Sequence, residues 1–306
     1  METRHGLIRF AWLSIGTAVL TISLKVAAYA LTGSVGLLSD ALESGVNLVT
    51  AVFSLIVLSI ATRPPDDDHP HGHGKAEYFS SGLEGLLILV AAGGIGITAV
   101  RSFIHPQPLE QLGIGLLISI VAALCNLITA TILRRAGKRH DSITLTASSH
   151  HLLSDVYTSF GIAIGVGAVA LIGWQWLDGT LALIVAAHIL RTGLNLVYDS
   201  SQGLMDRTLP NEEHQQIVNI LDEFKAQQVQ YHALRTRRSG NQRFISVHIQ
   251  VPGAWSVQQG HELLEDIERN MRQTIPPVHI LTHLEPLEDP ASWEDLTLNR
   301  VDGNGR

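Results

Sequence analysis

Residues 37–58 read LLSDALESGVNLVTAVFSLIVL, an apolar stretch that is long enough to cross a bilayer as a helix and yet contains Glu43 and Asn47. A second apolar stretch, residues 147–172, reads ASSHHLLSDVYTSFGIAIGVGAVALI and contains His151 and Asp155. Each pair is spaced four residues apart, so its two side chains lie on one face of a helix. Ionisable groups inside a membrane helix are costly and usually mark an ion or proton pathway.

Brought together, these two helix faces would offer one ion two carboxylates, an amide oxygen and an imidazole. Four donors of this kind suit the tetrahedral coordination of zinc, and His and carboxylate ligands also bind Fe(II), Mn(II), Co(II) and Cd(II). The alternative is that the polar groups only bond the helices to one another. Asp40, on the same stripe as Glu43, is interpreted as a group beside the site or at its entrance, with ligation as the alternative. Lys25 is expected to snorkel to the outer membrane interface, with a functional role as the alternative.

The composition is that of a membrane protein with a soluble tail. Of 306 residues, 46% are hydrophobic and only 16% are charged, whereas about 25% are charged in a typical soluble domain. The formal net charge is -7 and no basic face stands out, so nucleic acid is not expected as a partner. The single cysteine, Cys125, excludes a disulfide or a thiolate metal cluster within one chain.

Apolar stretches predict six membrane spans, at residues 8–31, 35–62, 78–101, 112–133, 145–172 and 176–199. Basic residues gather near the N-terminus and in the loop between the fourth and fifth spans, at Arg134, Arg135, Lys138 and Arg139. The positive-inside rule therefore places four regions in the cytoplasm: the N-terminus, the loop between the second and third spans, the loop between the fourth and fifth spans, and the C-terminal region. Residues 1–205 are thus predicted to be an α-helical transmembrane transport domain.

Residues 206–290 have the pattern of a small soluble domain. A helix is expected at 211–224, a hairpin turn at Ser239-Gly240-Asn241, an alternating strand at 244–251, an amphipathic helix at 256–275 and a last strand at 278–284. This αββαβ order predicts a two-layer α+β domain. Residues 291–306 are expected to be a flexible tail.

Two further clusters have the composition of metal sites. The loop after the second span reads DDDHPHGHGK (66–75), with histidines alternating with glycines beside a carboxylate run; a merely solvated loop is the alternative. In the C-terminal region, His283 and Glu285 share one strand face, and His248 lies on the face opposite to its apolar row. His232 and His261 add two more candidate ligands, although each lone histidine could also be a surface or packed side chain.

The motifs together resemble the cation diffusion facilitator family of bacterial divalent metal cation/proton antiporters of the zinc and iron exporter type. The resemblance covers residues 8–288 and rests on LLSDALES (37–44), DDDHPHGHGKAE (66–77), HLLSDV (151–156), LMDRTLP (204–210), LRTRRSGNQRFISVHIQV (234–251) and HILTHLEP (279–286).

The resemblance implies a homodimer with three kinds of metal site and a cytoplasmic ferredoxin-like domain used for regulation and dimerisation. It also implies an ion pair between Lys75 and Asp206 that ties the membrane domain to this cytoplasmic domain. The implied ligands are Glu43, Asn47, His151 and Asp155 for transport, Asp66, His69 and His73 in the loop, and His232, His248, His261, His283 and Glu285 for a two-metal site at the dimer interface.

Four residues depart from the family pattern. The pair Glu43 and Asn47 stands where zinc-type members usually have Asp or His followed by Asp, which removes one negative charge. Zinc is therefore the first expectation, with Fe(II), Mn(II), Co(II) and Cd(II) left open. Glu285 stands where the shorter Asp is common, and Leu284 cannot donate to a metal, so the interface site is expected to differ in detail.

The sequence thus predicts an exporter in a plasma or bacterial inner membrane that exchanges a divalent metal cation for protons. His suits proton coupling because its unperturbed pKa is about 6.5. The alternative is a membrane metal sensor or scaffold that does not transport. No enzymatic activity is expected, because no HExxH, Walker or nucleophile-elbow motif is present. Glu84 is the one acidic candidate for such chemistry, and it is expected instead to pack or hydrogen-bond near the cytoplasmic side.

Overall fold

The computed structural model describes residues 2–32, 35–104, 112–172 and 176–293. Within the helices some side chains fall outside the description, and those of Asp40 and Glu43 are among them. The chain divides into two compact units, Met1–Leu204 and Met205–Arg306. Each unit is described by itself.

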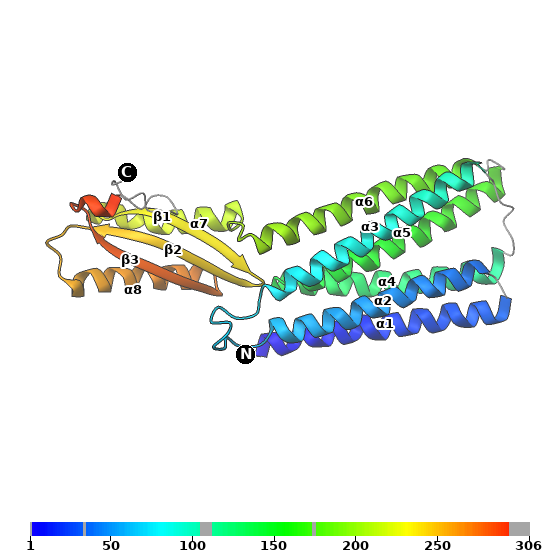
Figure 1. Ribbon diagram of the computed structural model, residues 1–306, viewed down its shortest axis with the longest axis horizontal. Coiled ribbons are helices and arrows are strands. Elements are labelled where there is room, and N and C mark those ends of the chain that lie inside the picture. The colour runs from blue at the N-terminus through cyan, green and yellow to red at the C-terminus, as the bar shows by residue number, and fades with distance from the viewer. Residues whose placement is uncertain (1, 33–34, 105–111, 173–175, 294–306) are drawn as a thin grey trace, which may run out of the picture. The chain divides into compact units, whose positions relative to one another are not determined.

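The first unit consists, in its described part, of long helices that run alongside one another (Figure 1). Helices suit these apolar segments because every backbone N–H and C=O is then bonded within the segment, as a bilayer requires. The helices are α1 Glu2–Thr32, α2 Val35–Ala61, α3 Ala76–Ile104, α4 Leu112–His140, α5 Ile143–Ile172 and α6 Trp176–Leu204.

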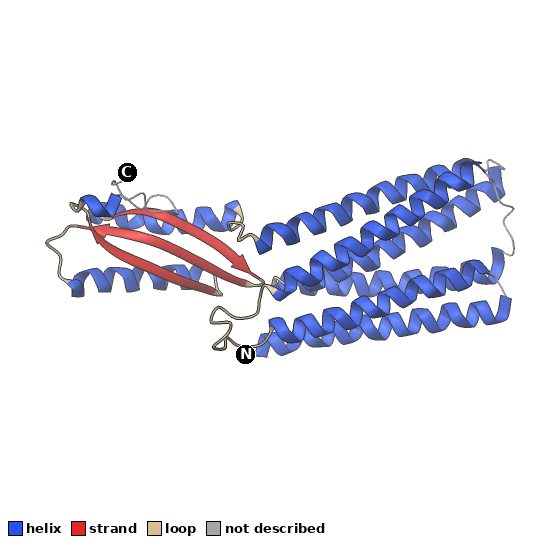
Figure 2. Cartoon of the chain, viewed as in Figure 1, coloured by secondary structure: helices blue, strands red, loops and turns tan. Residues whose placement is uncertain are grey.

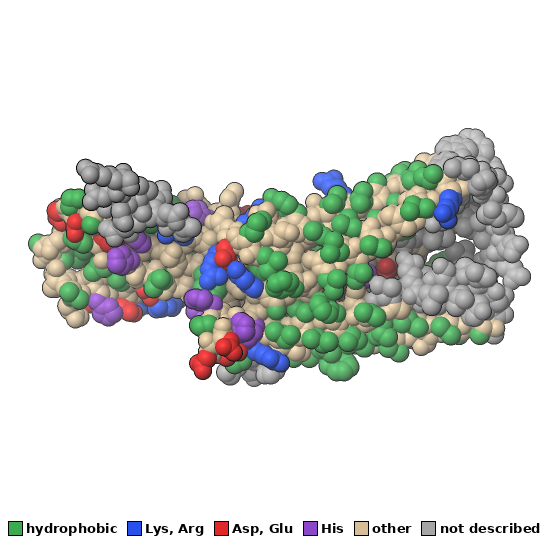
Figure 3. Space-filling model, viewed as in Figure 1, with side chains coloured by type: hydrophobic (Ala, Val, Ile, Leu, Met, Phe, Trp, Pro, Cys, Tyr) green, Lys and Arg blue, Asp and Glu red, His purple; other side chains and the backbone are tan. Residues whose placement is uncertain are grey.

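Burial in the helical unit is the reverse of that in a soluble protein. Large apolar side chains face outward, with Val90 74% exposed, Val49 68% and Ile128 62%. Polar side chains are buried between the helices, among them Lys25 at 6% and Glu84 at 1%. On the face shown in Figure 3, hydrophobic side chains are spread along the described helices of this unit and charged ones are few, as expected for helices whose surroundings are lipid chains.

Three segments of the described chain are long and apolar enough to cross a membrane: Leu7–Ala27, Ala76–Arg101 and Ile120–His140. They belong to α1, α3 and α4. Three of the six predicted spans therefore meet this criterion of length and composition, while crossing by α2, α5 and α6 stays a prediction.

Helix α3 packs closely against α6, α4 against α5, and α1 against α2. Glycines bring α3 and α6 together, as small residues do in many membrane helix pairs. A Cβ atom on Gly85 would lie 2.8 Å from Val197 Cγ2 and 3.1 Å from the Val197 backbone N. A Cβ atom on Gly193 would lie 2.9 Å from Leu89 Cδ2. The two helices could not approach so closely with larger residues at these positions.

The second unit has the predicted αββαβ order (Figure 2). Its described elements are α7 Asn211–Glu223, η1 Phe224–Gln227, β1 Gln230–Ser239, β2 Gln242–Val251, α8 Val257–Thr274, β3 Val278–Pro286 and η2 Pro290–Trp293. The sheet has the order β1-β2-β3. Strands β1 and β2 are antiparallel, whereas β2 and β3 are parallel because α8 connects them.

One face of this sheet forms a core with α7 and α8. Val247, Ile249 and Ile267 are 0% exposed and belong to this core. Side chains alternate between the two faces of a strand, so His248 points to the opposite face, as the sequence predicts. The sheet thus keeps one apolar face for folding and leaves the other for polar groups.

Residues 290–293 differ from the expectation of a flexible tail that starts at residue 291. They form η2, in which Ser292 is buried and its Oγ donates to the Pro286 carbonyl at 2.8 Å. The Ser292 carbonyl accepts from Gln250 Nε2 at 3.2 Å. These two bonds attach η2 to β2 and β3. The remainder of the expected tail, residues 294–306, lies outside the described residues.

Candidate functional site

The intramembrane site is built where α2 and α5 meet. Asn47 Nδ2 donates to Asp155 Oδ2 at 2.5 Å, and Asn47 Oδ1 lies 2.7 Å from His151 Nε2. Because an amide oxygen only accepts, the His151 ring carries its proton on Nε2 in this arrangement. Three of the four predicted transport ligands are therefore joined, although Asn47 lies more than a hundred residues before His151 and Asp155 in the sequence. The side chain of Glu43 lies outside the described residues.

The bonds at this site occupy the atoms that a metal would use. His151 is 8% exposed and Asn47 is 7% exposed. The Asn47 oxygen accepts the His151 proton, and the Asp155 oxygen accepts an Asn47 proton. A cation bound by both His151 Nε2 and Asn47 Oδ1 would have to displace the hydrogen bond between these two atoms. The observed arrangement thus joins the three side chains through their own donors and acceptors.

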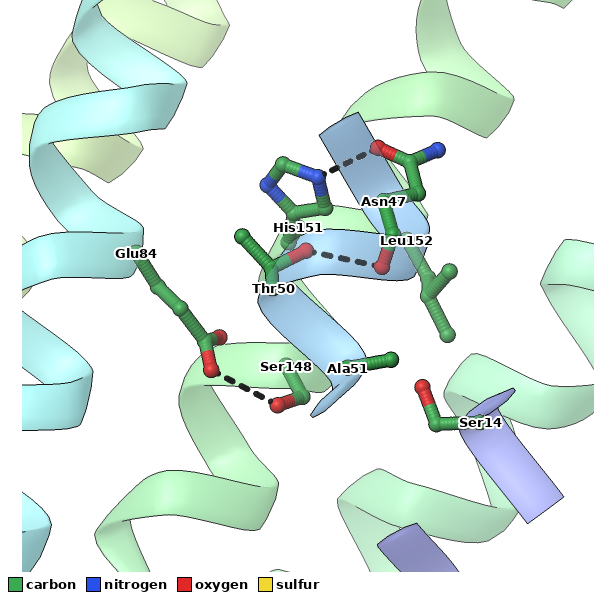
Figure 4. A pocket seen from close by; sticks show the side chains of 8 residues that line it. All are labelled: Ser14, Asn47, Thr50, Ala51, Glu84, Ser148, His151 and Leu152. Carbon is green, nitrogen blue, oxygen red and sulfur yellow. Dashed lines mark hydrogen bonds between the residues drawn. The ribbon is translucent and has the colours of Figure 1, made fainter. Parts of the chain in front are cut away.

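A small cavity connects this site to a second buried acid. Its lining is shown in Figure 4: Ser14, Asn47, Thr50, Ala51, Glu84, Ser148, His151 and Leu152. Glu84 reaches in from α3, and its Oε1 accepts from Ser54 Oγ at 2.6 Å and from Ser148 Oγ at 2.8 Å. The sequence expectation that Glu84 forms hydrogen bonds agrees with this geometry. Its place in the same cavity as Asn47 and His151 was not foreseen.

Lys25 corrects a sequence expectation. It was expected to snorkel to the outer interface, but it is only 6% exposed. Its Nζ donates to Ser44 Oγ at 2.6 Å, on the helix that carries Asn47. A buried ammonium needs hydrogen-bond acceptors around it, and α2 supplies one that lies within a helical turn of Asn47. The positive charge therefore belongs to the interior of the helical unit.

The loop between α2 and α3 brings the predicted Asp66, His69 and His73 together. His69 Nδ1 lies 3.2 Å from Asp66 Oδ1, and His73 Nε2 lies 3.3 Å from Asp66 Oδ2. The ligand-capable atoms of the three residues all lie within 4.8 Å of one another. The His69 backbone N–H donates to Asp66 Oδ1, and this bond, with weaker help from the two rings, lowers the pKa of the Asp66 carboxyl. The carboxylate is thereby held ionised and pointed at both imidazoles.

On the open face of the sheet, His232, His248 and His283 form one row across the three strands. Glu285 connects them: its Oε2 lies 2.8 Å from His232 Nε2, and its Oε1 lies 2.9 Å from His248 Nδ1 and 3.5 Å from His283 Nε2. Glu285 is buried, with 6% of its surface exposed. Its two oxygens lie next to different histidines, which is the arrangement that a carboxylate needs to bridge two metal ions.

The fifth predicted ligand of this cluster, His261, is placed differently. It is exposed on α8, the helix that packs on the apolar face of the sheet through Leu263 and Ile267. The ligand-capable atoms of His232, His248 and Glu285 lie within 4.8 Å of one another, and this group does not include His261. Its ligand role at a dimer interface stays a prediction. Leu284 packs on α8, where a Cβ on Gly260 would lie 2.2 Å from its Cδ2, so its role is in the core.

The predicted partners Lys75 and Asp206 belong to different units. Within the first unit, Lys75 Nζ donates to the Leu204 carbonyl at 3.5 Å, at the end of α6. Within the second unit, Asp206 Oδ1 accepts from Arg237 Nη1 at 3.4 Å. Both residues are thus held next to the junction of the two units, and their pairing stays a prediction.

Comparison with known proteins assigns both units. Residues 11–205 match the family model of the cation efflux transmembrane domain, and residues 209–287 match the cation efflux protein cytoplasmic domain. The chain is 50% identical over 285 residues to the uncharacterized transporter sll1263 of Synechocystis, covering 93% of this chain and 92% of that protein. It is 31% identical over 269 residues to the cation-efflux pump FieF of Citrobacter koseri, covering 88% of this chain and 89% of that protein. The cation-efflux pump FieF of Escherichia coli K12 is 31% identical over 278 residues, covering 91% and 92%.

Proposed function

Because the chain belongs to the cation diffusion facilitator family of integral membrane cation efflux proteins, we propose that it exports a divalent transition-metal cation from the cytoplasm in exchange for protons. Divalent metal cation efflux is what the family and the FieF relatives support. The observation that supports the finer proposal is the His151–Asn47–Asp155 chain of hydrogen bonds, buried between two apolar helices. Such a chain binds either protons or a metal.

The charges of the proposed ligands suit a divalent ion. Glu43 and Asp155 each carry one negative charge when ionised, whereas Asn47 and neutral His151 carry none. Two negative charges neutralise a divalent cation without help from solvent. Zinc fits a four-donor set of this kind, and the amide oxygen of Asn47 also admits Fe(II), Mn(II), Co(II) and Cd(II). Zinc is the first candidate within that class.

Proton exchange follows from competition for the same atoms. A metal and protons compete for the imidazole of His151 and for the carboxylate of Asp155. Loading of the metal from the cytoplasm therefore displaces the protons that these groups have bound, and protonation from the outside releases the metal. The helices rock between inward and outward access, and this alternation makes the exchange directional. The metal cation and the protons thus bind alternately at one site.

The cytoplasmic unit is proposed to regulate this cycle. The matched cytoplasmic domain is a dimerisation domain, which supports a homodimer. Metal bound at the interface would join two such domains and bias the rocking equilibrium. The proposed ligands are His232, His248, His283 and Glu285, with His261 added at the interface. The loop that carries Asp66, His69 and His73 would bind the metal before the transport site does. The positive-inside pattern supports an orientation with both termini in the cytoplasm of a plasma or bacterial inner membrane. We propose no enzymatic role.

The test is metal uptake into proteoliposomes under an imposed pH gradient, for Zn(II), Fe(II), Mn(II), Co(II) and Cd(II). We compare the wild type with Asp155→Ala and with the control Asp199→Ala, an exposed acid on α6. We expect uptake that depends on the gradient, is lost in Asp155→Ala and is kept in Asp199→Ala. The ion that is taken up identifies the transported metal. Uptake that persists after the gradient is dissipated would refute proton exchange. If no metal is transported while the cytoplasmic unit still binds metal, the sensor alternative is correct.

A further inference from the structure

The cavity beside the transport site contains a carboxyl group that the proposed transport chemistry leaves unused. Glu84 is 1% exposed, and its Oε1 accepts from two neutral hydroxyls, those of Ser54 and Ser148. Its other oxygen, Oε2, is buried and has no hydrogen-bond partner within the described part of the structure. From these observations we infer that Glu84 is a proton-binding station for the exchange, placed between the transport site and the cytoplasm. The inference rests on the proposed function.

The position of Glu84 along the helices supports a station on the cytoplasmic side. Ser54 lies seven residues nearer than Asn47 to the end of α2, which is about 10 Å at the rise of an α-helix. Ser148 lies one turn nearer than His151 to the start of α5. Both helix ends face the loops proposed to be cytoplasmic. Glu84 therefore lies on the route that a proton would take from the transport site to cytoplasmic water.

The donor set favours a proton over a metal ion at this station. A transition metal needs about four donors, usually with more than one anionic or imidazole ligand. Glu84 offers one carboxylate, and the two nearby hydroxyls already donate to it. An ionised carboxylate without a cationic partner is costly at this depth. A single proton on Oε2 satisfies that atom and removes the charge.

Few other charges face this carboxyl group. The titratable side chains that line the cavity are Glu84 and, on α5, His151. His150 on α5 is half-buried and does not line the cavity, and on α6 Arg191 and Asp199 are exposed. From α2, the described groups that face Glu84 are hydroxyls, so a divalent cation at the transport site is the charge that changes most near Glu84 during the cycle.

The coupling step balances without an added reactant. In the metal-free form Glu84 holds the proton on Oε2. A divalent cation at the transport site attracts negative charge, so the O–H bond of Glu84 breaks and its proton passes to cytoplasmic water. When the metal leaves outward, a proton that enters through the site restores the carboxylic acid. The exchange therefore gains one proton that no metal ligand carries.

The test counts protons released when metal binds to the full-length protein in weakly buffered detergent solution. Zn(II) is the probe, an indicator dye reports the protons, and calorimetry reports the ions bound. We expect Glu84→Gln to release about one proton fewer per transport-site ion than the wild type, with the number of bound ions unchanged. In an Asp155→Ala background, Glu84→Gln should change nothing, because the transport-site cation is then absent.

Controls separate this role from loss of structure. Glu84→Asp keeps a carboxyl group and should restore proton release. Glu77→Gln alters another buried acid of α3, which is bonded to Ser142 Oγ and the Thr144 N–H and does not line the cavity, and it should release as many protons as the wild type. Equal release by Glu84→Gln and the wild type would overturn the inference, and so would the loss of one bound ion, which would make Glu84 a metal ligand. Failure of transport by the wild type would refute the proposed function, and the proton count would still decide the role of Glu84.

Discussion

At the scale of single residues, Asn47 is the feature that sets this chain apart from a fully acidic metal site. Its amide bridges His151 and Asp155 because it can donate and accept at once. An aspartate at this position could only accept when ionised. The neutral bridge therefore holds the metal-free site together without placing two like charges side by side.

We predict that Asn47→Asp binds zinc more tightly and releases it less readily. The added carboxylate lies beside Asp155, so the empty site gains repulsion that a cation or a proton relieves. The expected gain is about tenfold in affinity at neutral pH, and it should shrink as the pH falls because protons compete. Calorimetry of zinc binding at several pH values measures it, with Asn47→Ser as the variant that only loses the amide. Equal affinities of Asn47→Asp and the wild type would contradict this account of the bridge.

Asp66 gives a pH prediction for the loop. The hydrogen bond from the backbone N–H of His69 lowers the pKa of this carboxyl below its ordinary value. A group with a lowered pKa in the folded state stabilises that state above its ordinary pKa, and the contribution is lost as the pH falls through the lowered value. Asp66 therefore stays ionised to a lower pH than an ordinary aspartate does.

We accordingly expect Asp66 to remain a charged metal ligand at pH values below the ordinary pKa of an aspartate. Asp66→Asn should weaken zinc binding at every pH, whereas Asp67→Asn, at a neighbouring exposed acid, should not. Zinc titrations on variants that lack the other two sites measure this. A binding curve for Asp66→Asn that coincides with the wild-type curve would show that the loop binds zinc without Asp66.

At the scale of helices, the close contact of α3 with α6 depends on small residues at the point where the helices meet. Gly85 directly follows Glu84 and lies against the backbone of Val197. Gly85→Ala should therefore separate the two helices and destabilise the helical unit by about 1–3 kcal/mol, as overpacking does. Gly93→Ala on the same helix is the matched control, since nothing lies within 4 Å of its Cβ position. Thermal unfolding in detergent measures both, and equal midpoints would show that α3 and α6 can separate without cost.

At the scale of the whole molecule, the proposed regulation predicts that transport depends on the metal cluster of the cytoplasmic unit. Glu285 holds His232, His248 and His283 together. Glu285→Ala should raise severalfold the metal concentration for half-maximal transport and leave the maximal rate unchanged, because the transport ligands are intact. His279→Ala, at an exposed histidine on the same strand, is the control. Unchanged transport kinetics for Glu285→Ala would make the cluster structural.

Local sequence patterns predict much of this architecture. Apolar stretches of membrane length and the αββαβ alternation depend on periodicity within one element, so they could be read without a structure. The same holds for the pairs at i and i+4 on α2 and α5, and for the row of polar residues opposite Val247 and Ile249 on β2. These features follow from backbone geometry that every helix and strand shares.

Only the tertiary structure decided which of these groups meet. Asn47 bonds His151, and Glu84 joins Ser54 and Ser148, through contacts between helices that are remote in the sequence. Lys25 shows the same limit, because its distance from the membrane surface suggested snorkelling while the packing of α1 on α2 buries it against Ser44. Periodicity tells which face of a helix is polar, but the neighbour of that face is set by how all the helices pack together, and no single segment encodes that choice.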